Sequence, residues 1–242
     1  MIRHQATLRS IALAHPATIA VMERLQLDYC CGGSQTLGEA CAHRQLDPDA
    51  VLAELAAAST TTGAQPRDLT GEPLAVIMSE IVHTHHAYVR ASLPQLLSMS
   101  AKVGVKHGPK HPELVELDHT LVALAEDLLQ HLAKEEVVLF PYIERLELSL
   151  ENGTEPPHAC FASVANPVAA MISEHDTAGE LLGKMRTLTG DYTLPDEACT
   201  TLRGLYAGLA AFEQDLHLHI HRENNLLFPR AIALEQSVAA TA

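Results

Sequence analysis

The sequence predicts an all-α protein, an antiparallel four-helix bundle preceded by a small helical domain. Alanine and leucine are abundant whereas aromatic residues make up only 4% of the chain, which favours helices over sheets. From residue 74 onward, apolar residues recur with the period of a helix almost throughout. Short segments rich in glycine and proline separate four long periodic stretches, and this arrangement is typical of an antiparallel bundle.

The pattern divides the chain into three parts. Residues 1–58 carry short periodic stretches separated by turn residues, so we expect a compact helical domain. Residues 59–73 lack apolar periodicity and are rich in serine, threonine, glycine and proline, the composition of an interdomain linker. Residues 74–236 are long enough for the bundle.

Within the small domain, turn and capping residues predict where the helices begin and end. The first helix should end near Ala14, because Pro16 suits the first turn of the next one. Thr36 and Glu39 have the spacing of a capping box at the start of a helix. A further helix is expected at residues 48–57.

Four long helices are expected in the bundle, and prolines should bend three of them. Pro94 lies inside the first helix, while Pro141 and Pro229 occupy matching places in the second and fourth. Because proline lacks an N–H group, each should kink its helix. The predicted spans are 74–101, 113–148, 167–188 and 195–234.

A motif of aspartate, histidine and glutamate, each four residues apart and followed by Leu-Phe-Pro, occurs twice. Its second copy begins at Asp215, 88 residues after Asp127. Residues four apart lie on one face of a helix, so each copy presents a polar face that needs a partner inside a bundle. The motif histidines and glutamates are His131, Glu135, His219 and Glu223.

The first and third helices complete the pattern, because His86 and His175 are 89 residues apart, nearly the same offset. Two similar helical hairpins would therefore bring four imidazoles and two carboxylates together. That number of ligands suits two metal ions bridged by the carboxylates, and ligands of nitrogen and oxygen leave iron, manganese and zinc as candidates. The predicted ligands are His86, His131, Glu135, His175, His219 and Glu223.

Several assignments stay open at this point. A single buried histidine is more often a hydrogen-bonded core residue than a ligand, so the joint pattern carries the prediction. His83 and His85 lie beside His86, and adjacent helical residues point about 100° apart, so only one normally faces the metals. Asp127 and Asp215 are either hydrogen-bond acceptors for His131 and His219 or surface residues. Glu174 is either a further acid near the site or a surface residue. His221 is expected to be exposed or in contact with a ligand.

The adjacent thiols of Cys30 and Cys31, followed by two glycines, form a second motif. Either this loop exposes the thiols and lowers a thiolate pKa, or the cysteines are small buried residues beside a turn. An odd count of five cysteines shows no disulfide framework, so we expect free thiols and a cytoplasmic location. A net charge of −14 argues against nucleic acid and anionic membranes, and no stretch is apolar enough to span a membrane.

Together these motifs resemble the repair-of-iron-centres family, also called iron–sulfur cluster repair di-iron proteins, over nearly the whole chain. The residues that carry the resemblance are Asp28-Tyr-Cys-Cys-Gly-Gly, His86 with Arg90, His131-x2-Lys-Glu-Glu-x2-Leu-Phe-Pro, Glu174-His-Asp and His219-x3-Glu-Asn-Asn-x-Leu-Phe-Pro-Arg.

The resemblance implies a hemerythrin-like bundle with two non-haem iron ions, bridged by an oxo or hydroxo group and by Glu135 and Glu223. It also implies repair of iron–sulfur proteins damaged by nitric oxide (NO) or oxidative stress, with Cys30 and Cys31 taking part, and a homodimer. NO and O2 are the expected small ligands, and whether the centre reduces NO to N2O stays open. The alternative is a hemerythrin-like carrier or sensor that binds O2 or NO reversibly.

Overall fold

A computed structural model describes residues 2–60, 66–158 and 161–241, with side chains described as far as residue 238. Residues 61–65 of the predicted linker lie outside this description. By its contacts the chain divides into two compact units, one combining residues 1–73 with 217–230 and the other combining residues 74–216 with 231–242. The described ranges contain helices and connections but no β-strand.

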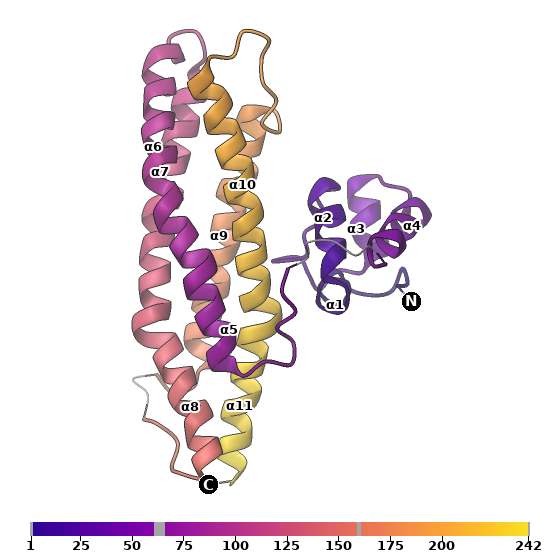
Figure 1. The fold of residues 1–242 in the computed structure, drawn as a ribbon, viewed down its shortest axis with the longest axis vertical. Helices are drawn as coiled ribbons and strands as arrows, with labels where there is room; N and C mark the ends of the chain where they lie inside the picture. The colour runs from indigo at the N-terminus through magenta and orange to yellow at the C-terminus, as the bar shows by residue number, and fades with distance from the viewer. Residues whose placement is uncertain (1, 61–65, 159–160, 242) are drawn as a thin grey trace. The chain divides into compact units, whose positions relative to one another are not determined.

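The first unit contains the amino-terminal helices (Figure 1), and they begin and end where turn residues predict. Thr36 accepts a hydrogen bond from the Glu39 N–H, and the Glu39 carboxylate accepts one from the Thr36 N–H, so the predicted capping box is confirmed. The helices are α1 (Leu8–Ala14), α2 (Ile19–Arg24) after a 3-10 turn at Pro16–Thr18, α3 (Leu37–Arg44) and α4 (Pro48–Ala58).

The core of this small helical domain is apolar. Met22 of α2 and Leu55 of α4 are fully buried in it together with Leu8 and Leu37, and the Tyr29 ring joins them. Burial of such side chains contributes about 1.5–3 kcal/mol each relative to their exposed state. This core therefore fixes the ends of the loop that carries Cys30 and Cys31.

The long helices of the bundle are interrupted by three π-helical turns. Figure 1 shows α6 beside α7, and α7 also packs along α9. The helices are α5 (Leu74–Glu80), α6 (Ala87–His107), α7 (Pro112–Lys134), α8 (Phe140–Asn152), α9 (Ala165–Thr189), α10 (Thr200–Arg222) and α11 (Phe228–Thr241). The π turns are η2 (Ile81–His86), η3 (Glu135–Leu139) and η4 (Glu223–Leu227).

Leucines at helical spacing on α7 form the middle of the bundle core. Leu117, Leu121 and Leu124 have no exposed surface, and Leu114 and Leu128 extend the same stripe to either side. Their spacing of three and four residues places them on one face of the helix. His131 and Glu135 continue the same spacing beyond Leu128. One face of the helix therefore presents both apolar and polar side chains to the core.

Four predicted boundaries are wrong by four to seven residues. The second and fourth long helices end at Asn152 and Thr241 rather than at residues 148 and 234. The first long helix continues to His107 rather than ending at residue 101, because Val103 is buried and extends the apolar face of α6. The fourth helix begins at Thr200 and not at Pro195, because a turn closed by the Ala198 N–H and the Pro195 carbonyl precedes it.

The prolines after the two motif glutamates act differently from the predicted kinks. In η3 the Phe140 N–H bonds the Glu135 carbonyl five residues back, and in η4 the Phe228 N–H does the same with Glu223. Pro141 then occupies the first turn of α8, where its missing N–H group costs no hydrogen bond. The interruption is therefore a π turn at the glutamate, and α6 continues through Pro94.

Carboxylates cap two bundle helices at positions 88 residues apart, the offset of the repeated motif. Glu147 accepts hydrogen bonds from the N–H groups of Leu74 and Ala75, at 2.7 and 2.9 Å. Glu235 accepts one from the Val164 N–H at 2.9 Å, just before α9. The two hairpins thus share their helix caps as well as their polar motif. No helix within the described ranges is long and apolar enough to cross a membrane.

Replacing Glu147 with alanine should lower the free energy of unfolding by about 1–2 kcal/mol, because two N–H groups at the start of α5 lose their acceptor. Chemical denaturation measured by circular dichroism checks this. The matched control is Glu144→Ala on the exposed face of the same helix, which should change stability little. Equal stability of Glu147→Ala and the control would contradict the capping role.

Candidate metal centre

The π turns lie at the residues predicted to bind metal. His86 ends η2, Glu135 begins η3 and Glu223 begins η4. A π turn adds a residue to the helical repeat, and such turns often occur at functional sites. Each turn here gives a polar side chain a direction that an uninterrupted α-helix would not provide.

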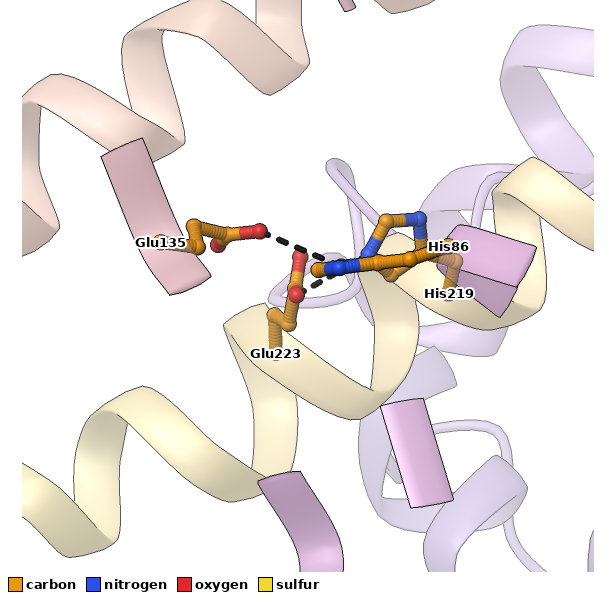
Figure 2. A group of neighbouring side chains, drawn as sticks. All are labelled: His86, Glu135, His219 and Glu223. Carbon is orange, nitrogen blue, oxygen red and sulfur yellow. Dashed lines mark hydrogen bonds and ion pairs between the residues drawn. The ribbon is translucent and has the colours of Figure 1, made fainter. Parts of the chain in front are cut away.

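Around Glu135, three imidazoles from three bundle helices converge. The Glu135 carboxylate oxygen Oε2 lies 3.4 Å from His86 Nε2 and 3.5 Å from His131 Nε2. His175 on α9 places its Nε2 atom 3.0 Å from His131 Nε2. Glu135 and His86 have no exposed surface, and the other two rings are 2% exposed. Figure 2 shows the Glu135 carboxylate directed toward the His86 ring.

The outer nitrogen of two of these rings is held by a carboxylate. His86 Nδ1 lies 2.6 Å from Glu136, which also accepts a hydrogen bond from Arg90. His131 Nδ1 lies 2.9 Å from Glu174, which accepts a hydrogen bond from Lys134. An ionised carboxylate only accepts hydrogen bonds, so each Nδ1 carries the proton and each Nε2 presents a lone pair inward.

Both outer carboxylates are stabilised in their ionised form. Burial raises the pKa of Glu136, but Arg90 and His86 outweigh it and hold that pKa below its usual value. At Glu174 burial acts in the same direction and is likewise outweighed, here by Lys134 and His131, so the pKa is lowered. Two negative charges therefore back the imidazoles at neutral pH.

This arrangement fits a metal cation. The lone pairs on the Nε2 atoms of His86 and His131 face a carboxylate oxygen, and two acceptors cannot hydrogen-bond to each other. Ligand atoms about 2.1 Å from one ion stand roughly 3.0–3.4 Å apart, close to the distances found here. A cation between them satisfies all three groups. Buried imidazoles and carboxylates without thiolate suit non-haem iron.

The second copy of the motif is also buried. His219 Nε2 lies 2.9 Å from the Glu223 carboxylate, one helical turn further along the chain, and neither side chain has exposed surface (Figure 2). These two residues belong to the unit that contains residues 217–230. The histidine–glutamate pair thus has the same local spacing and the same burial as His131 with Glu135.

The neighbouring histidines and aspartates have separate roles. His85 is buried and its Nδ1 atom lies 2.9 Å from Asp215. His83 contacts the Ser79 carbonyl on the exposed side of its helix. Asp127 is exposed, and Glu174 takes the place beside His131 that Asp127 was a candidate for. Glu174 therefore contacts the candidate ligand His131 and is not merely a surface residue.

Glu136 is a functional candidate that the sequence argument missed. It follows Glu135 directly, so on a helix it points about 100° away, toward α6, where Arg90 and His86 are found. Its adjacency to Glu135 and the spacing of Arg90 one turn after His86 were visible in the sequence. Their pairing across two helices was not.

The loop with Cys30 and Cys31 is held by side chains from both ends of its unit. Asp28 Oδ1 accepts hydrogen bonds from the N–H groups of Cys30 and Cys31, at 3.2 and 2.9 Å. Asn225 of η4 donates its amide N–H groups to the carbonyls of Tyr29 and Cys30, at 3.0 and 3.3 Å. His221 is buried against the Tyr29 carbonyl, so the expectation of an exposed His221 is wrong.

Of the two alternatives for these thiols, a lowered thiolate pKa does not hold for Cys30, which is instead a small buried residue beside a turn. Its hydrogen bond with Cys31, its burial and the negative charge of Asp28 all raise the pKa of the Cys30 thiol well above its usual value. Cys30 is therefore a neutral thiol at neutral pH, while Cys31 is partly exposed.

The helical bundle and its buried histidines and glutamates define a hemerythrin-type cation-binding protein. In agreement, the profile of the Hemerythrin HHE cation binding domain matches residues 77–231, and that of a Domain of Unknown function (DUF542) matches residues 4–59.

Proteins that are similar over nearly the whole chain identify one family within this class. The chain is 38% identical over 230 residues to the Iron-sulfur cluster repair protein YtfE of Escherichia coli O81 (strain ED1a), covering 94% of this chain and 97% of that protein. The proteins of the same name from Escherichia fergusonii and Escherichia coli O7:K1 (strain IAI39 / ExPEC) match to the same extent. The chain belongs to the family of iron–sulfur cluster repair proteins.

Replacing Asn225 with alanine should free the loop, because the carbonyls of Tyr29 and Cys30 lose a shared donor. We expect a thiol reagent to modify the buried Cys30 several-fold faster, as measured by mass spectrometry of the labelled peptide. Asn152→Ala, which removes a hydrogen bond at the exposed end of α8, is the control. Equal labelling of Cys30 in both variants would show that Asn225 does not hold the loop.

Proposed function

We propose that this protein repairs iron–sulfur clusters damaged by nitric oxide or oxidative stress, using two non-haem iron ions held in its helical bundle. The observation that carries the proposal is the buried set of inward-facing imidazoles around Glu135. It occurs in a chain with 38% identity, over 94% of its length, to proteins named for iron–sulfur cluster repair. Damaged iron–sulfur proteins are accordingly the proposed partners.

In this proposal, six residues hold the ions, and Glu135 and Glu223 each bridge both. Helix geometry supports the contribution of the second motif. Helix α10 is continuous from Thr200 to Arg222, so Asp215 and His219 lie one turn apart on the same face. Asp215 contacts His85, the neighbour of His86. The proposed ligands are His86, His131, Glu135, His175, His219 and Glu223.

Burial gives further support within each unit taken by itself. In one unit, His86, His131, Glu135 and His175 are all buried, and in the other His219 and Glu223 are buried. Each unit thus supplies one of the two glutamates of the repeated motif together with at least one buried imidazole.

A bound, reduced iron pair would bind NO or O2. It would supply either the reduction of two NO, with two electrons and two protons, to N2O and water, or iron for a damaged cluster. The chain holds and shields this centre. Glu136 and Glu174 fix the orientation of two imidazoles by accepting their Nδ1 protons. The Phe140 ring stacks on His86 at 5.9 Å and excludes water from that side.

The thiols of Cys30 and Cys31 are proposed to take part in repair, at the step where iron or electrons pass to the client. Thiolates bind iron more softly than the histidines and carboxylates of the bundle do. Free thiols of this kind persist in the cytoplasm, where we expect the protein to act as a homodimer. Sedimentation of the purified protein tests the dimer.

The repair function is tested with the reduced, iron-loaded protein. We expect it to react with NO, seen as a change in its iron spectrum, and to restore activity to an enzyme whose iron–sulfur cluster has been damaged by NO. The metal-free protein and a protein loaded with zinc are the controls. A sample with about two irons per chain that did neither would exclude the proposed function.

Replacing both Cys30 and Cys31 with alanine separates repair from the alternative, a reversible carrier or sensor of O2 or NO. The candidate iron ligands are unchanged in this variant, so NO binding should persist while cluster reactivation falls markedly. The control is Cys199→Ala, which alters a thiol outside the loop. Undiminished repair by the Cys30/Cys31 variant would assign the two thiols to packing.

Glu135→Ala should release both ions together, because the glutamate is proposed to bridge them. Iron analysis after dialysis should fall from about two ions per chain to near none. Circular dichroism confirms that the variant is folded, and Glu126→Ala on the exposed face of α7 is the control. Retention of one iron by Glu135→Ala would contradict bridging by this residue.

A further inference from the structure

Three ligand-type side chains meet in the amino-terminal loop, outside the histidine and glutamate set. The Cys30 sulfur lies 3.3 Å from Asp28 Oδ1 and 4.0 Å from the Cys31 sulfur. One ligand atom from each of these residues lies within 4.8 Å of the others. The two sulfur atoms are far beyond the roughly 2.05 Å of a disulfide, so both cysteines remain thiols.

These separations match the edges of a tetrahedral metal site. With metal–sulfur bonds of about 2.3 Å and a metal–oxygen bond of about 2.1 Å, the sulfur–sulfur edge is about 3.8 Å and the sulfur–oxygen edge about 3.6 Å. The observed 4.0 and 3.3 Å differ from these by about 0.2 and 0.3 Å. A cation could therefore enter with small side-chain rotations and no movement of the backbone.

We propose that Asp28, Cys30 and Cys31 form a second metal site, which binds one divalent transition-metal ion through two thiolates and one carboxylate. Three protein ligands leave the fourth tetrahedral position open. Asp28 is exposed and Cys31 is partly exposed, so an ion can reach the site from solvent. Zinc accepts this ligand set in a tetrahedral arrangement.

The loop is built in advance for this geometry. Asp28 Oδ1 accepts the N–H groups of both cysteines and so fixes its carboxylate beside the sulfur atoms. A Cβ atom at Gly32 would lie 2.9 Å from Asp28 Oδ2, and one at Gly33 would lie 2.6 Å from the Tyr29 carbonyl. Glycine is therefore required at position 33, and a side chain at position 32 would displace the Asp28 carboxylate.

Electrostatics favour a cation in the loop. Two thiols and a carboxylate share a small volume, so the negative charges of ionised thiols and of the carboxylate repel one another in the metal-free protein. A bound cation removes that repulsion and releases the thiol protons, as thiolate coordination requires. The site needs no iron in the bundle, so it stands independently of the proposed repair activity.

Cobalt titration of the reduced, iron-loaded, full-length protein under anaerobic conditions tests the site. Thiolate ligands give Co(II) a sulfur-to-metal charge-transfer absorption, which the nitrogen and oxygen ligands of the bundle do not give. We expect this absorption to saturate at about one Co(II) per chain. Its absence from the wild-type protein would overturn the proposal, whatever the outcome of the NO and repair assays.

Two variants and a control assign the absorption. Cys31→Ser should abolish it, and Asp28→Asn should weaken Co(II) binding by about tenfold or more, because the amide keeps the hydrogen-bond acceptor but loses the charge. Cys199→Ser should leave it unchanged. Unchanged bundle iron in each variant shows that the bundle is intact. Absorption that survives in Cys31→Ser, or equal affinity in Asp28→Asn, would overturn the assignment of ligands.

Discussion

Burial of the Glu135 carboxylate is the constraint on which the centre of the bundle depends. A charge without any exposed surface is costly unless opposite charge or hydrogen bonds compensate it. The groups nearest to it, His86 and His131, turn lone pairs toward it because their other nitrogens are committed to Glu136 and Glu174. A cation bound between these groups would offset the buried negative charge, which is why the set fits a metal ion.

The charges around this centre alternate outward. Next to the inward-facing imidazoles lie the carboxylates of Glu136 and Glu174, and beyond them Arg90 and Lys134 approach the surface. The partly exposed pairs contribute little stability by themselves because water screens them. Their effect is to keep the carboxylates ionised and the imidazole rings oriented. Such contacts commonly set the orientation of a metal-binding histidine and its affinity for the metal.

The π turn η4 contains both a proposed iron ligand and a residue that contacts the cysteine loop. Glu223, a proposed iron ligand, begins this turn, and Asn225 in the same turn holds the carbonyls of Tyr29 and Cys30. Asp28 and the two glycines complete that loop from the amino-terminal side.

The sequence by itself determined the helices, the capping box at Thr36 and the repeated histidine and glutamate positions, because helical spacing and caps are local properties of the chain. The tertiary structure decided which groups face each other. Glu136 beside His86, Glu174 beside His131 and Asn225 beside Tyr29 join residues more than 40 positions apart. The raised pKa of Cys30 has the same origin, since burial of its sulfur depends on the packed core of the small domain. Spacing along one helix cannot specify contacts that only packing brings together.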